Sequence, residues 1–215
     1  MLELDHPRLH AATLQSWWLL LVVATVGLIW SGTAPLDRAT WTLEVFPVVF
    51  ALLILWPTRK RFPLTPLLYV LIAIHASILM LGGHYTYAEV PLGNWLRDLF
   101  DLQRNHYDRL GHLAQGFIPA MIARELLLRK TPLLRGAWLF FLVTCVCLAL
   151  SAVYEFLEWW TALIGGGSAD AFLGTQGDVW DTQWDMFLAT CGAIAAQLIL
   201  ASWHDRQLRR FTAGT

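Results

Sequence analysis

The sequence is poor in charged residues. Of its 215 residues, 14% are Asp, Glu, Lys or Arg and 57% are hydrophobic, with a mean hydropathy of +0.51. Soluble globular domains usually carry about 25% charged residues, so the composition excludes an ordinary soluble domain. The formal net charge of −1 leaves no basic surface that would predict a nucleic-acid partner. The composition instead predicts an integral membrane protein.

Cysteine is scarce, and several well-known catalytic motifs are absent. Cys145, Cys147 and Cys191 all lie in apolar stretches, where a free thiol acts as a small hydrophobic group. Neither a disulfide framework nor a CxxC metal site is therefore expected. The chain has no HExxH zinc motif, P-loop, GxGxxG turn or nucleophile elbow, so nothing in it supports nucleotide binding or a serine hydrolase triad.

Long apolar runs, in contrast, are plentiful. A helix needs about 20 mostly apolar residues to cross a bilayer. Six stretches qualify: 14–32, 39–57, 63–83, 108–128, 136–160 and 181–203. Residues 91–102 form a shorter amphipathic segment, which we expect to lie at the membrane interface. We therefore expect an all-α, six-transmembrane-helix bundle that forms a single integral membrane domain over residues 1–215.

Basic residues indicate the orientation of these spans, because cytoplasmic loops are enriched in Lys and Arg. If the N-terminus is cytoplasmic, eleven basic residues lie on the inner side and four on the outer side. The eleven are Arg8, Arg59, Lys60, Arg61, Arg124, Arg129, Lys130, Arg135, Arg206, Arg209 and Arg210, and the four are Arg38, Arg97, Arg104 and Arg109. Both termini are therefore expected in the cytoplasm.

Four of the predicted spans carry polar residues at a similar depth. Counted from the cytoplasmic charges at about 1.5 Å per residue, these residues lie near the outer surface: His84, His112, Glu155 and Asp185. Helical spacing also groups polar side chains on one face of a helix. The groups are Asp108, His112 and Gln115; Glu155 and Glu158; and Asp178, Asp181 and Asp185. Ionisable groups within spans are costly, face the bundle interior and by default mark function.

Imidazoles beside several carboxylates suit a divalent metal ion such as Zn, Mn or Fe. The candidate ligands are His84, His106, Asp108, His112, Glu155 and Asp185. Glu158 and Asp181 are candidate general bases, and Arg104, Arg109 and Gln115 are candidate substrate-binding residues. The alternative for Glu155, Glu158, His112 and Asp185 is an internal salt-bridge network with Arg109 or His106. Separately, Asp178 followed by Asp181 is typical of a helix N-cap with an acidic first turn.

Four motifs carry a resemblance to a known family. They are GGHYTYAEVPLG (82–93), RNHYDRLGHLAQGFIPAMIARE (104–125), YEFLEW (154–159) and LGTQGDVWDTQWDM (173–186). Together they resemble the YjdF-like family of bacterial inner-membrane proteins, over roughly residues 60 to 205. The resemblance implies a location in the bacterial cytoplasmic (inner) membrane, but no reaction, because the function of that family is unknown.

A weaker similarity is to VanZ-like membrane proteins, through an acidic residue and a histidine that open one helix, a later glutamate, and a final helix containing Asp and Gly. The corresponding residues are Asp108, His112, Glu155 or Glu158, Asp185 and Gly192. This similarity implies cell-envelope chemistry.

The leading hypothesis from the sequence is a metal-dependent membrane hydrolase or transferase that acts on a lipid or cell-envelope precursor in the outer leaflet. Membrane lipids would then be its partners. A proton- or ion-coupled transporter is the alternative, and it ranks lower because the inner halves of the spans read as nearly pure hydrocarbon. A non-catalytic scaffold or sensor, whose polar cluster only holds the bundle together, is a third hypothesis.

Overall fold

The computed structural model describes residues 5–165 and 175–212, and within these ranges it consists of helices and their connections, without strands. The helices are α1 (Asp5–Ser31), α2 (Arg38–Thr58), α3 (Pro66–Tyr85), the short 3-10 helix η1 (Tyr87–Glu89), α4 (Pro91–Leu99), α5 (Tyr107–Lys130), α6 (Ala137–Gly165) and α8 (Asp181–Thr212). The expectation of an all-α fold is therefore confirmed.

Five of the long helices, α1, α2, α3, α6 and α8, are long and apolar enough to cross a membrane. The sequence predicted six such segments, and the remaining one, 108–128, corresponds to α5. This helix is less apolar than the other five, because it carries polar residues at both ends. Asp108 and His112 lie near its start, and Arg124 and Glu125 lie near its end, all of them buried.

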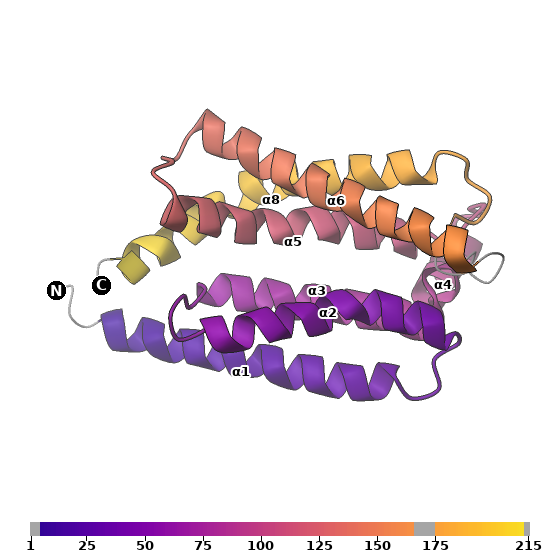
Figure 1. Ribbon diagram of the computed structural model, residues 1–215, viewed down its shortest axis with the longest axis horizontal. Coiled ribbons are helices and arrows are strands. Elements are labelled where there is room, and N and C mark those ends of the chain that lie inside the picture. Colours follow the sequence, from indigo (N-terminus) through magenta and orange to yellow (C-terminus); the bar gives the residue numbers. More distant parts are fainter. Residues whose placement is uncertain (1–4, 166–174, 213–215) are drawn as a thin grey trace.

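The long helices form two groups that run along the long axis of the molecule (Figure 1). The N-terminal half consists of α1, α2 and α3, and the C-terminal half consists of α5, α6 and α8, with α3 packed against α5 to join them. Figure 1 also shows that α1 begins and α8 ends at the same end of the molecule. The opposite end carries α4.

Specific side chains explain where α3 begins. The sequence predicted a helix from residue 63, but α3 begins at Pro66, with Thr65 as its N-cap residue. Proline is favoured in the first helical turn because it needs no hydrogen-bond partner there. The side chain of Glu125 accepts hydrogen bonds from the Thr65 amide and hydroxyl, at 3.3 and 2.8 Å, and so fixes this start against α5.

Helices α5 and α8 make the closest contact in the bundle. A Cβ atom on Gly116 would overlap the carbonyl of Ala189, and one on Gly192 would overlap the carbonyl of Leu113. Glycine at both positions therefore allows the two backbones to touch, as small residues do at helix interfaces in membranes. This contact sets α5 beside α8 along their length.

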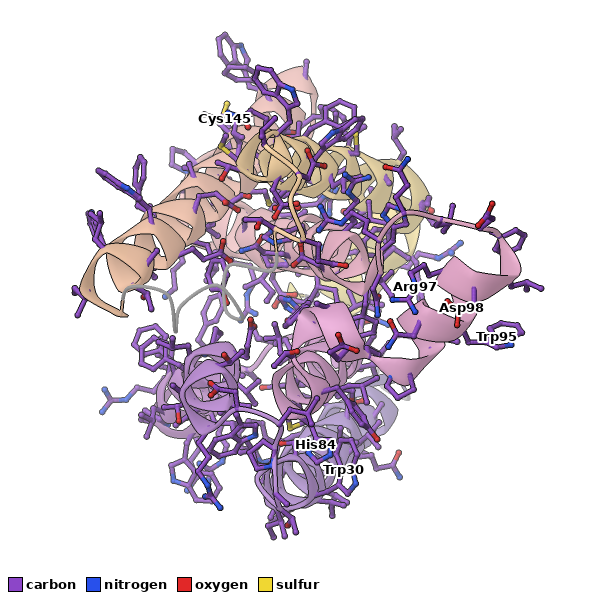
Figure 2. All side chains as sticks on the ribbon, turned by 90° about the vertical axis from the view of Figure 1, so that its right-hand side faces the viewer. Trp30, His84, Trp95, Arg97, Asp98 and Cys145 are labelled. Atoms are coloured by element: carbon purple, nitrogen blue, oxygen red, sulfur yellow. The ribbon has the colours of Figure 1, made fainter. Side chains whose placement is uncertain are left out.

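Helix α4 exposes its apolar side chains. Leu92, Trp95 and Leu99 are 54%, 59% and 57% exposed, and Figure 2 shows Trp95, Arg97 and Asp98 standing away from the bundle. The protein itself therefore leaves the apolar face predicted for residues 91–102 uncovered.

We predict that Gly116→Ala destabilises the protein by about 1–3 kcal/mol, because the added methyl group forces two backbones apart. The measurement is the melting temperature of detergent-purified protein. Gly27→Ala is a matched control, since its methyl group meets only the flexible end of Met80. Equal melting temperatures for the two variants would contradict the proposed backbone contact.

Candidate metal site

His112 lies at the centre of a buried polar cluster near the start of α5. Its Nε2 atom is 3.5 Å from Asp108 Oδ1 and 3.8 Å from Asp185 Oδ2, and its Nδ1 atom is 3.8 Å from Glu155 Oε1. Helices α5, α6 and α8 each contribute to this cluster. Its members are Asp108, His112, Glu155, Glu158 and Asp185, all of them buried.

The hydrogen bond between His112 and Gln115 distinguishes the two ring nitrogens. His112 Nδ1 lies 2.9 Å from Gln115 Oε1, and because an amide oxygen only accepts, Nδ1 is the donor. The lone pair of a neutral imidazole is then on Nε2, which faces Asp108 and Asp185. Atoms that bind one Zn ion at about 2.1 Å in tetrahedral geometry lie about 3.4 Å apart, so the two distances from Nε2 fit a shared ion.

Two sets of three residues have ligand atoms within 4.8 Å of one another. One set is Asp108, His112 and Asp185, and the other is His112, Glu155 and Glu158. Three buried carboxylate oxygens of these sets make no hydrogen bond: Asp108 Oδ2, which lies 3.5 Å from Arg104, Glu155 Oε1 and Asp185 Oδ1. Buried carboxylates normally have such partners, so these oxygens are suited to a cation.

The arginines next to the cluster are bound by other carboxylates. Arg104 Nη1 pairs with Asp181 and lies 3.5 Å from Asp178, and Arg104 Nη2 lies 3.5 Å from Asp108. Arg109 Nη2 is 2.7 Å from Asp178 Oδ2, and its guanidinium group lies over the ring of Trp184. A salt-bridge network is therefore present, but it joins the arginines to Asp178, Asp181 and Asp108, and not to Glu155, Glu158 or Asp185 as the alternative had it.

His84 is not part of the cluster that its depth predicted. Its Nδ1 atom is 2.9 Å from the carbonyl of Ser31, its ring lies 4.6 Å from that of Trp30, and Figure 2 shows His84 and Trp30 together in the N-terminal half. Depth along a helix does not determine the direction of a side chain around the axis, and this side of α3 faces α1.

His106 also lies outside both sets. It precedes α5 as its N-cap residue and is partly exposed. Burial, followed by the positive charges of Arg109 and Arg104, lowers the pKa of His106, so its imidazole stays neutral at neutral pH.

Asn105 and Gln176 hold the segment before α8 against the start of α5. The Asn105 amide donates to Gln176 Oε1, and Gln176 Nε2 donates to the Asn105 carbonyl, both at 2.9 Å. Asn105 Nδ2 also donates to the carbonyl of Val90 at 3.0 Å. These bonds hold together three of the sequence motifs, 82–93, 104–125 and 173–186.

Glu44 of α2 was not predicted as a site residue from the sequence. This residue is 4% exposed, and its Oε2 accepts a hydrogen bond from the Tyr154 hydroxyl at 3.3 Å. Glu44 is the only charged residue in 39–57, so the principle that drew attention to Glu155 would also have identified it.

Residues 16–206 match a family described as "Predicted membrane protein (DUF2238)". The chain belongs to this family. It is also 53% identical over 187 residues to the inner membrane protein YjdF of Escherichia coli (strain K12). The aligned residues make up 87% of this chain and 90% of that protein. No solved structure matches. The resemblance drawn from the four motifs is thus confirmed, and this DUF2238 member is a membrane protein with several helices able to span.

A second buried polar cluster lies at the other end of α5 in this DUF2238 protein. Glu125, fully buried, pairs with Arg129 at 2.6 Å and His204 at 2.9 Å in addition to its bonds to Thr65. Arg124 contacts His204 and pairs with Asp205. The expectation of apolar inner halves is therefore wrong at the ends of α5 and α8. The adjacent Arg124 and Glu125 in the sequence were the available signal.

We predict that Glu125→Ala lowers the free energy of unfolding by about 3–5 kcal/mol, because Arg129 and the buried His204 lose their acceptor. The melting temperature in detergent checks this result. Glu89→Ala, at an exposed position on η1, serves as the control and should behave like the wild type. A Glu125→Ala protein as stable as the control would show that the network contributes nothing.

Proposed function

We propose that this DUF2238 protein is a metal-dependent enzyme of the bacterial cytoplasmic membrane, a hydrolase or transferase that acts on a lipid or cell-envelope precursor. The observation that carries the proposal is the buried set Asp108, His112 and Asp185, in which both carboxylates face the Nε2 atom of one imidazole. The weaker similarity to VanZ-like proteins agrees with envelope chemistry.

Charge balance favours a metal over a purely structural role for this set. Four buried carboxylates surround His112. Arg104 lies 3.5 Å from one of them, Asp108, but its shorter pair is with Asp181, and Arg109 pairs with Asp178. Like charges packed together in a buried site repel one another. A divalent cation would relieve this repulsion and would also bind the carboxylate oxygens that make no hydrogen bond.

Asp108, His112 and Asp185 would hold the ion, whereas Glu155 faces the Nδ1 side of the imidazole and belongs to the other set. Gln115, predicted to contact substrate, would instead orient the imidazole through its hydrogen bond to Nδ1. Zn, Mn or Fe would supply a Lewis acid that polarises an oxygen of the substrate. His84 and His106 have no place in this ligand set.

Glu158 is the better candidate for the general base. It is buried within reach of His112 and also lines a cavity beside the site, whereas Asp181 is paired with Arg104. A base must be able to reach the proton it removes, and only Glu158 of these two is in contact with the cavity. Arg104 and Arg109 would meet an anionic head group only by exchanging their carboxylate partners.

The proposal includes six membrane crossings with both termini in the cytoplasm and α4 at the outer interface. Helix α1 begins and α8 ends at the same end of the molecule, which supports an even number of crossings and hence α5 as an additional crossing beside the five other helices (Figure 1). Its polar residues are covered by α3, α6 and α8. The excess of basic residues at that end supports the orientation.

Reporter fusions test this topology. A fluorescent protein fused after residue 215 should fluoresce, because it folds in the cytoplasm, and alkaline phosphatase inserted after residue 102 should be active, because it folds outside. Active phosphatase both after residue 102 and at the C-terminus would indicate an even number of crossings between these sites and would contradict a membrane-spanning α5.

Metal content tests the enzyme proposal most directly. We predict about one metal ion per chain in detergent-purified protein, measured by elemental mass spectrometry, and its loss in His112→Ala and Asp185→Asn. Glu155→Gln should retain most of the metal, since Glu155 faces the protonated ring nitrogen.

His84→Ala is the matched control, because it removes a histidine outside both sets, and it should keep its metal. All variants are compared at equal monodisperse yield. A wild type without metal, or equal content in every variant, would refute the proposed site.

Ion- or proton-coupled transport is the second candidate, and the buried cluster around Glu125 and His204 favours it, because a relay needs polar groups at both ends. Between the two clusters, however, the backbones at Gly116 and Gly192 are in contact with α8 and α5, which leaves no room for water at that interface. Proton flux into liposomes that is lost in His204→Ala would favour the transporter. A scaffold role would predict neither metal nor flux.

A further inference from the structure

A cavity of about 320 Å³ lies beside the candidate metal site, between the two halves of the bundle. Helices α2, α3, α5 and α6 line it. Ligand pockets in proteins commonly have volumes of about 300–1,000 Å³. This cavity can enclose a polar head group and the adjoining carbons, but not a complete lipid.

The cavity opens sideways between α2 and α6. Phe46 and Phe50 on α2, and Leu150 and Val153 on α6, line it and are 57%, 52%, 49% and 53% exposed. These residues lie in the middle of two helices able to span the membrane. Helix α2 packs against α3 and α1, whereas α6 packs against α5 and α8. The opening therefore faces the hydrocarbon of the bilayer, where acyl chains are the surrounding molecules.

The end of the cavity farthest from its opening, next to the candidate metal site, is acidic. Glu44, Asp108 and Glu158 line it together with His112, and no lysine or arginine does so among the residues that the structure describes. His75 also lines it, and its buried Nε2 atom makes no hydrogen bond. A bare phosphate would be repelled by this wall, whereas a positively charged group with N–H donors would be its complement.

We infer that the occupant is a membrane lipid with an ammonium head group, which enters sideways between α2 and α6. Its chain contacts Phe46, Phe50 and Val153, and its ammonium group contacts Glu44 and Glu158 beside the metal site. The inference rests on the proposed function for what happens to the lipid, but binding itself is independent of the metal. It narrows the substrate class from any lipid or precursor to one with a cationic group.

Native mass spectrometry of the full chain in detergent tests the inference. Phosphatidylethanolamine and phosphatidic acid with the same acyl chains are titrated separately, because only the first has an ammonium group. We expect one phosphatidylethanolamine molecule to bind saturably to each chain, and phosphatidic acid to bind about tenfold more weakly. Equal binding of both lipids would overturn the head-group assignment.

The location of the site is tested by obstructing the opening. Val153→Trp and Leu150→Trp add bulk at exposed positions of the opening, so folding should be unaffected, and each should reduce phosphatidylethanolamine binding about tenfold. Val146→Trp is the matched control, on the same helix but outside the cavity, and should bind like the wild type. Unchanged phosphatidylethanolamine binding in both obstructed variants would show that the lipid binds only around the outside of the bundle, and would overturn the inference.

Glu44→Gln tests the recognition of the head group. Glu44 belongs to neither candidate metal set, so this variant should keep its metal while it loses the preference for phosphatidylethanolamine. An unchanged preference would overturn the assigned contact. A dimer that Val153→Trp abolishes, without bound lipid, would show that a second copy covers the opening, and would also overturn the inference.

The two proposals fail in different measurements. Metal without selective lipid binding leaves the proposed enzyme intact and overturns the lipid inference. Selective lipid binding without metal supports the lipid site and refutes the metal-dependent enzyme.

Discussion

The contact between α5 and α8 is the constraint on which the rest of the structure depends. Glycine at positions 116 and 192 lets the two backbones touch, and this proximity sets Asp108 and His112 alongside Asp185. A larger residue at either glycine would separate the helices, and the two carboxylates would no longer face the same imidazole nitrogen. Close backbone packing at the two glycines thus positions the ionisable side chains of the candidate metal site.

The two polar clusters at the ends of α5 differ in how well their groups are satisfied. Both carboxylate oxygens of Glu125 accept hydrogen bonds, as expected of a network that fixes helices in register. Around His112, three buried carboxylate oxygens accept none, and a cavity lies next to this cluster. The first cluster is suited to stability, and the second is suited to binding.

Much of the fold could be predicted from the sequence, because apolar length and helical spacing are local properties. Helical spacing grouped His112 with Asp108, and depth along the spans grouped it with Glu155 and Asp185, which the structure also brings together. His84 was misplaced because its direction around α3 depends on the position of α1, which no local pattern encodes. Glu125 and His204 come together only through tertiary packing, so their pairing was not predictable.

The polarity of α5 has a consequence for biosynthesis. This helix is too polar to enter a bilayer readily by itself, and its buried residues find their partners largely on α8, which leaves the ribosome after α5 and α6. The ionisable side chains of α5 therefore lack these partners until α8 has been synthesised. Neither polar cluster can be complete before α8 has joined α5.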